Sequence, residues 1–393
     1  MKWPGRGLFY GLVLLSWVLT CAAGPAGASP SYRYFMNGTE ISGGIRSGGM
    51  HLVPLKSAFE SLGYEVSWEQ KSRTATLYIP GQTIEVKADR GQVKVNGQMV
   101  PLERSHLVLK KGTLMIAVKE AAQLTGSRLT VEENELRLES ENRFIYGKQG
   151  QAAFWIGGSG EIYSRAGSGE PRLIGKVNVE LKEWRYAKMS IQPIAQSGSS
   201  IVTATAFSGE PLIFSVTVKL FVHNSQVLHS AVSGGDGNPR TAKQGGLWVF
   251  AEGGSIRYIN DRGAVVHSYN INEWLGRDHY SLEGFAGERL LLIRAESSQL
   301  LWVVDPLAKR GVLLYQTILG SEEQASIEKN TDTADMHYGD NLYLRSAQDG
   351  LLTFSYFSYL QGAQESVLAV RIADLQEALA EQPETTDIGG GFP

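Results

Sequence analysis

Three acids and two aromatic residues gather in one short stretch of the chain, a mixture that could carry chemistry on a sugar. Glu273, Asp278 and Glu283 surround Trp274 and Tyr280. Glycoside hydrolysis uses a pair of carboxyl groups, and aromatic rings offer flat apolar faces on which a sugar ring can stack. The separation that matters is spatial, and the favoured interpretation of the stretch is an ordinary loop between blades, whose tryptophan packs between neighbouring sheets.

A second aromatic pair, Trp184 and Tyr186, lies in a longer connection between strand-like runs, where exposure is expected. Trp155, Trp248 and Trp302 instead lie inside apolar strand patterns, which predicts that they belong to the core. The residues that could form a recognition surface are therefore Trp184, Tyr186, Trp274 and Tyr280.

Two other segments resemble the motifs of reactive sites but do not match them in context or spacing. The segment 157–160 contains a serine among glycines, but it lacks the strand-to-helix context of a nucleophile elbow. The acidic run 330–335 begins like a calcium loop, yet Asp335 and Asn341 stand where such a loop needs Gly and Glu. This run and the loop 235–238 are interpreted as solvated connections. We predict no catalytic residue, no cofactor and no metal ligand.

The N-terminus is typical of an export signal. Lys2 and Arg6 precede an apolar run over residues 8–19, and an A-x-A site predicts cleavage after Ala28. The run is shorter than the roughly twenty residues that a transmembrane helix needs, so the mature chain is expected to have no transmembrane segment. Lipoprotein processing at Cys21 is the alternative. Either route leads to secretion or to the cell surface.

The amino-acid composition excludes some classes of binding partner and some kinds of stabilising interaction. Cys21 is the only cysteine, so cleavage after Ala28 leaves a chain without disulfides or thiolate metal sites. The formal charge of −3 includes two cations of the signal, and the mature chain has no long basic run. This balance disfavours nucleic acid as a partner. The mature chain is long enough to bury the cores of two domains.

One structural unit occurs twice in the sequence that follows the predicted export signal. The segment 52–63 combines a Val-Pro-containing strand end with an apolar helical stripe and a terminal glycine. The segment 116–126 repeats this pattern with Ala117 in the place of Pro54. Each copy is preceded by an Asn-Gly turn and followed by two alternating strand runs. The pattern predicts a small α+β domain over residues 32–140.

This first region resembles the copper amine oxidase N-terminal-like domain, an accessory module on exported proteins of Gram-positive bacteria. The resemblance is carried by Leu52-Val53-Pro54-Leu55, Ala58-Phe59, Leu62-Gly63, Val66, Trp68 and Thr74-Ala75-Thr76-Leu77. It implies a fold and an accessory role rather than the oxidase chemistry. The chain has no His-x-His pair and no Asn-Tyr-acid triplet, so copper binding and amine oxidation are not expected.

The second region, 150–380, carries hairpins at regular spacing. Successive apolar strands are separated by steps of 46, 46, 43 and 52 residues, taken from the markers Trp155, Ile201, Leu247, Leu290 and Leu342. A period in the forties with several short strands per repeat is typical of propeller blades. A helix is expected over 372–380 and a disordered tail over 381–393.

The sequence thus predicts a mainly β protein, with a small two-repeat α+β domain followed by a β-propeller of five blades. A sixth blade would require the segment after Glu365 to close the ring, and a β-sandwich with irregular loops is the alternative architecture. The expected function is non-enzymatic binding or scaffolding at a bacterial cell envelope, with a wall polymer or an envelope protein as partner. A glycan-active enzyme with acids in the propeller channel, or a ligand-sensing envelope protein, would also fit.

Overall fold

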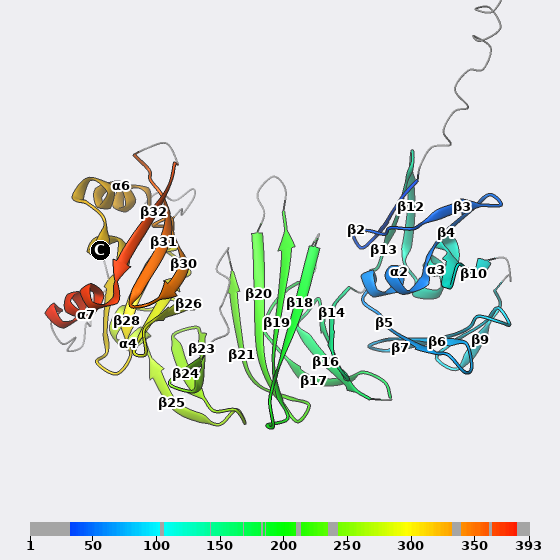
Figure 1. Cartoon of the computed structure of the whole chain (residues 1–393), viewed down its shortest axis with the longest axis horizontal. Helices are drawn as coiled ribbons and strands as arrows, with labels where there is room; N and C mark the ends of the chain where they lie inside the picture. Colours follow the sequence, from blue (N-terminus) through cyan, green and yellow to red (C-terminus); the bar gives the residue numbers. More distant parts are fainter. Residues whose placement is uncertain are drawn as a thin grey trace, which may run out of the picture.

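The computed structural model describes residues 32–102, 106–141, 143–167, 169–181, 184, 186–209, 214–234, 243–331, 339–360 and 364–382. These residues form a small α+β domain and a series of five antiparallel sheets (Figure 1). The predicted export signal and its predicted cleavage site, Cys21, the loop 235–238, Asp335 and nearly all of the predicted tail lie outside the described residues.

The first domain contains three small sheets and two helices. Its helices are α2 (Leu55–Ser61) and α3 (Val118–Thr125). Its strands are β1 (Arg33–Met36), β2 (Thr39–Glu40), β3 (Ile45–Ser47), β4 (Met50–Pro54), β5 (Glu65–Glu69), β6 (Thr74–Ile79), β7 (Gln82–Lys87), β8 (Gln92–Val95), β9 (Gln98–Val100), β10 (Leu107–Lys110), β11 (Thr113–Ala117), β12 (Arg128–Glu132) and β13 (Glu135–Glu139). The sheets have the orders β12-β13-β1-β2, β10-β11-β4-β3 and β5-β6-β7-β8-β9.

The doubled unit is confirmed. β4 leads into α2 and then the pair β5 and β6, whereas β11 leads into α3 and then the pair β12 and β13. The two copies meet where β4 and β11 pair antiparallel, with Val53 opposite Ile116. Gly126 has a φ of 65°, the left-handed backbone with which glycine ends a helix.

The Asn-Gly turns explain how each copy begins. Asn37 and Gly38 have φ values of 46° and 81°, and Asn96 and Gly97 have values of 49° and 79°. Positive φ at both central residues is the type I′ geometry, whose twist matches that of the flanking strands. These turns join β1 to β2 and β8 to β9.

The second region contains five sheets in chain order. The first consists of β14 (Phe144–Gln149), β15 (Ala152–Gly157), β16 (Glu161–Ala166) and β17 (Arg172–Lys176). The second consists of β18 (Tyr186–Ile194), β19 (Ser199–Ser208), β20 (Phe214–His223) and β21 (Gln226–Gly234), and the third of β22 (Lys243–Gln244), β23 (Leu247–Glu252), β24 (Ser255–Ile259) and β25 (Val265–Asn270). The fourth consists of β26 (Tyr280–Ala286), β27 (Leu290–Ala295), β28 (Leu301–Asp305) and β29 (Arg310–Leu313), and the fifth of β30 (Leu342–Gln348), β31 (Leu351–Phe357) and β32 (Glu365–Arg371).

Each of the five sequence markers falls in a different sheet, so the fold class is confirmed: propeller-type blades follow the small domain. Each sheet is an antiparallel meander of consecutive strands, as propeller blades are. The segment after Glu365 supplies β32, the last strand of the fifth sheet. The second region starts at Phe144, six residues earlier than predicted, because β14 occupies the expected boundary.

Apolar clusters join successive sheets. Ile156 and Val202 share the cluster between the first and second sheets, and Phe221 and Phe250 the cluster between the second and third. The third and fourth sheets, and the fourth and fifth, are joined in the same way. No cluster among the described residues combines the first sheet with the fifth, and in Figure 1 these two sheets lie apart. The described blades therefore form an open series.

The second region contains more helices than the sequence predicts. Besides the predicted α7 (Ile372–Glu381), the structure has α4 (Asn272–Leu275), α5 (Leu314–Ile318) and α6 (Ser321–Thr331). Helix α6 is mostly polar, and Ile327 is its buried contact with the core shared by the fourth and fifth sheets. Such a helix has little apolar periodicity to detect. Acids in the first turn and Lys329 in the last turn are the signals that could have indicated it.

The small domain is fixed to the first blade by Trp155 and Glu65. Trp155 of β15 is fully buried in the hydrophobic core of the small domain, and its Nε1 donates a 2.8 Å hydrogen bond to the Gly63 carbonyl. The Glu65 carboxylate, with a side chain only 2% exposed, accepts bonds of 2.6 Å from Lys148 Nζ and from Arg165 Nη1. Both partners lie in the first blade.

Replacing Glu65 with alanine should lower the free energy of unfolding by about 3 kcal/mol, because the nearly buried Arg165 loses its counter-charge. Urea denaturation followed by tryptophan fluorescence measures the loss. Glu69→Ala removes an exposed acid from the same strand and should change stability by less than about 0.5 kcal/mol. Equal effects of the two variants would show that the ion pairs do not stabilise the domain contact.

A buried lysine lies between the second and third blades. Lys219 of β20 is 2% exposed, and its Nζ lies 3.4 Å from the Val249 carbonyl and 4.7 Å from the centre of the Phe250 ring. Burial lowers the pKa of Lys219 to about 7. The unfolded chain therefore binds the proton more tightly than the folded chain does.

Stability should rise between about pH 7 and pH 10, because over that range the unfolded state holds the Lys219 proton that the folded state has released. Lys219→Met should flatten this rise. Chemical denaturation of both proteins at several pH values measures the difference between their free energies of unfolding. Titrations that the two proteins share cancel in this difference. An identical slope in wild type and variant would rule out Lys219 as its source.

Candidate functional site

The predicted recognition residues separate into two groups. Trp274 and Tyr280 are 7% and 5% exposed, and they belong to the apolar cluster between the third and fourth sheets. The Tyr280 hydroxyl donates a 3.1 Å hydrogen bond to the Gly276 carbonyl. Their prediction as an exposed surface is wrong, because the apolar faces of two blades meet at this point, and the alternative of packing between sheets describes them.

The three acids around them also have separate partners. Glu273 accepts a 3.0 Å bond from Asn270 Nδ2, and Asp278 accepts a 3.2 Å bond from the Ser297 amide. Glu283 is 8% exposed and forms a bidentate pair with Arg294. Each of the three carboxyl groups therefore has a hydrogen-bond partner of its own, and Glu283 is the one that is buried.

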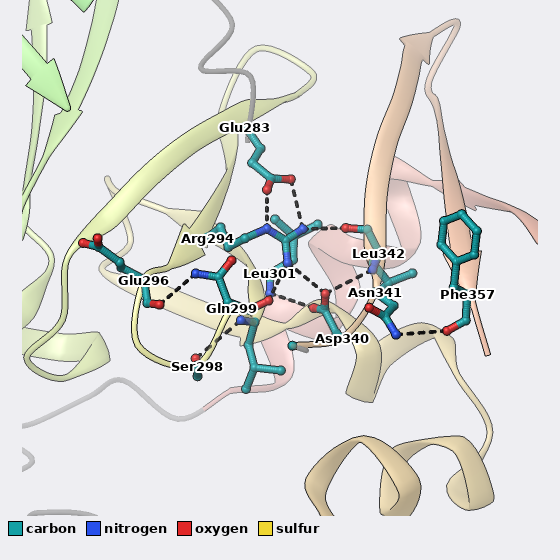
Figure 2. Close-up of polar contacts among 12 residues, drawn as sticks. Glu283, Arg294, Glu296, Ser298, Gln299, Leu301, Asp340, Asn341, Leu342 and Phe357 are labelled. Carbon is teal, nitrogen blue, oxygen red and sulfur yellow. Dashed lines mark hydrogen bonds and ion pairs between the residues drawn. The ribbon is translucent and has the colours of Figure 1, made fainter. Parts of the chain in front are cut away.

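Glu283 belongs to a buried network centred on Arg294 (Figure 2). Arg294 Nη1 donates to Asp340 Oδ1 at 3.0 Å, and Asp340 is fully buried. The other Asp340 oxygen accepts a 2.7 Å bond from the Leu301 amide, while Oδ1 accepts one of 3.2 Å from the Leu342 amide. Burial acts to lower the pKa of Arg294, but the two carboxylates outweigh it and raise that pKa.

This network joins the fourth sheet to the fifth. Asp340 links an amide of β28 to an amide of β30, and Arg294 of β27 also donates to the Leu342 carbonyl. Both acids are occupied by a guanidinium and backbone groups, so neither is placed to give a proton to a substrate or take one from it. The network's role is to fix how the two sheets meet.

Trp184 and Tyr186 lie together at the other end of the series, in a cleft between the small domain and the first two blades. Tyr186 is 55% exposed and stacks on Phe207 at 5.6 Å. Trp184 is 7% exposed, contrary to the expected exposure, because it packs into the core between the first and second sheets. Its carbonyl accepts a 2.7 Å bond from Arg143 Nη1.

We call this site the interdomain cleft, a space of about 110 Å³. Its lining residues that matter here are Asn37, Glu60, Ser61, Tyr146, Trp184 and Tyr186. They come from the first Asn-Gly turn, the end of α2, strand β14, the connection before β18 and the first residue of β18. No sequence pattern places Asn37, Glu60 and Tyr146 in one site, because only the docking of the two domains brings them together.

Glu60 is the ionisable acid of the interdomain cleft. Partial burial raises its pKa, while the positive charges of Lys56 and Lys148 act in the opposite direction. Burial, together with the negative charges of Glu65 and Glu60, also raises the pKa of the Tyr146 hydroxyl, which therefore stays protonated at neutral pH. Asn37 is held by the Ser140 amide, which donates to its Oδ1 at 2.9 Å, and Asn37 Nδ2 donates a long 3.5 Å bond to the Ser61 carbonyl.

Within the described ranges, no group of three or more His, Cys, Asp or Glu side chains could hold a metal ion. No helix in those ranges is both long and apolar enough to cross a membrane.

The first domain has a recognisable family. Residues 36–139 match the family model of the copper amine oxidase N-terminal domain. This confirms the resemblance seen in the doubled unit and covers a little over a quarter of the chain. No curated protein matches the chain at a significant level.

Solved structures align with the chain at low similarity. The computationally designed Ika8 protein is 12% identical over 88% of this chain and 98% of its own, with a TM-score of 0.27. An endo-arabinanase from Bacillus licheniformis is 9% identical over 58% of this chain and 92% of its own, with a TM-score of 0.22. BamB from Moraxella catarrhalis is 10% identical over 59% of this chain and 82% of its own, with a TM-score of 0.17. At these scores the alignments carry no functional argument, and the fold rests on the sheet topology.

Asp340→Ala should lower the free energy of unfolding by about 3–5 kcal/mol, because it leaves the buried Arg294 under-compensated and two amides without their acceptor. Urea denaturation measures this loss, and Glu273→Ala, which removes an exposed acid, serves as the matched control. A variant that unfolds like wild type would contradict the structural role of the network.

Proposed function

We propose that the protein is an exported component of a bacterial cell envelope that binds a wall polymer or an envelope protein and catalyses no reaction. The export signal and the accessory character of the first domain support this location. The blades would then act as a rigid scaffold on which loops and clefts are displayed.

The interdomain cleft is the observation that carries the proposal. It combines an exposed tyrosine, a buried tryptophan, a half-buried tyrosine and a carboxylate at the point where the accessory domain meets the first two blades. Such a mixture of aromatic faces and a few polar groups is what a recognition site for a polar ligand needs. The domain contact through Trp155 and Glu65 keeps the cleft in one geometry.

The glycan-active alternative needs two carboxyl groups facing one cleft. In the acid-rich stretch, Glu283 is bound by Arg294, and in the interdomain cleft Glu60 is the acid among the described lining residues. These arrangements support binding over hydrolysis.

Residues 29–393 should be retained on purified Gram-positive cell walls, and Tyr186→Ala should reduce retention several-fold because the largest exposed ring of the cleft is lost. Sedimentation with walls, before and after removal of teichoic acid, measures the binding. Tyr343→Ala, which removes a partly exposed tyrosine from the fifth sheet, is the control.

Loss of retention for wild type on both wall preparations would count against a wall ligand. Release of new reducing ends from the walls during the incubation would instead favour the enzyme alternative.

A further inference from the structure

We propose that the interdomain cleft binds a primary ammonium group carried by the wall polymer, either the free amine of an amino sugar or an aminoacyl ester. This inference rests on the proposed function and names the chemistry that its site would recognise. It is argued from the charge, the aromatic lining and the size of the cleft.

The cleft has a negative character. Glu60 supplies a carboxylate, and none of the described residues lining the space is a lysine, arginine or histidine. Glu60 and Ser61 are the last two residues of α2, so the negative end of the helix dipole points to the same place. Among the described residues, the Ser61 carbonyl accepts a long 3.5 Å bond from Asn37 Nδ2, and a carbonyl oxygen with two lone pairs can accept a further donor. Charge and acceptors therefore favour a cation with N–H donors.

The aromatic lining favours the same ligand. Ring faces carry negative potential and attract ammonium groups. Tyr146 lies 5.4 Å from the Trp155 ring, and Tyr186 stacks on Phe207, so both lining rings are held by other aromatic residues. A ring that is already fixed loses little entropy when a cation binds against it.

The nearby lysines do not neutralise the site. Lys148 is committed to Glu65 at 2.6 Å. Lys56 lies 4.0 Å from Glu60, but its side chain is 71% exposed, and a surface pair of this kind contributes little free energy. A ligand amine that is also in contact with the aromatic rings can take the place of Lys56 beside Glu60.

The size of the space decides how much of the ligand enters. About 110 Å³ is well below the several hundred that enclose a drug-sized molecule. It suits one functional group, with the rest of the polymer outside. An ammonium group at the end of a short branch or on a sugar ring meets this condition.

The experiment compares matched amines. Isothermal titration calorimetry of residues 29–393 with a glucosamine oligosaccharide, and with the N-acetylated oligosaccharide of the same length, tests the need for positive charge. The second arm uses D-alanylated lipoteichoic acid before and after mild base removes the alanyl esters. We expect at least one free-amine probe to bind, and its amine-blocked or amine-free counterpart to bind at least tenfold more weakly. The arm that shows the difference identifies the source of the ammonium.

Glu60→Gln keeps the shape of the side chain and removes its charge, and it should weaken amine binding about tenfold, as expected when a charge-assisted bond is lost. Glu132→Gln, an exposed acid elsewhere in the small domain, should leave binding unchanged. Equal thermal unfolding midpoints of both variants show that the fold is intact.

Three results would overturn the inference: equal binding of the free and blocked amines, an unchanged affinity in Glu60→Gln, or no binding of either amine probe. If whole walls still retain the protein in those cases, the proposed function stands and only its ammonium specificity fails. Absence of retention on walls as well would also remove the wall polymer as the partner in the proposed function.

Discussion

The arrangement of the whole chain depends on where Trp155 is buried. This side chain belongs by sequence to the first blade, yet it completes the hydrophobic core of the small domain and donates to the Gly63 carbonyl. Gly63 has a φ of 92°, and a Cβ there would lie 2.9 Å from the Phe144 carbonyl oxygen. Only glycine allows both the helix ending and this close approach. The accessory domain and the first blade therefore behave as one body, and the cleft between them has a fixed shape.

Beyond the first blade, each sheet packs on the next by burying apolar faces. Each sheet has one cluster in common with the next, so every blade is stabilised mainly by its neighbours, as in other repeat architectures. The Arg294 network is an exception within this apolar stacking. A buried guanidinium is tolerated because two carboxylates and backbone carbonyls satisfy it, and the same groups prevent the fourth and fifth sheets from sliding.

Most of the fold could be predicted because hydrophobic periodicity reports local structure. The doubled helix-and-strand unit and one marker strand in each blade follow from such patterns. Helix α6 was missed because a polar helix leaves almost no periodic signal, and Trp274 because an aromatic residue beside acids looks the same whether it faces solvent or another sheet. Two of the six residues named in the interdomain cleft, Trp184 and Tyr186, are among the recognition residues predicted from the sequence. Glu60 and Tyr146 join them only after two domains dock, which no local pattern encodes.

The distribution of carboxylates is the physical ground for proposing recognition over catalysis. A catalytic acid needs access to its substrate and a partner group a few ångströms away across the reacting bond. Glu283 and Asp340 lie close together but are buried and held by Arg294, so they have proximity without access. Glu60 has access, but among the described lining residues it has no second acid with which to work. A single accessible carboxylate beside fixed aromatic rings can hold a cation without transforming it, and this is the physical basis for treating the cleft as a binding site.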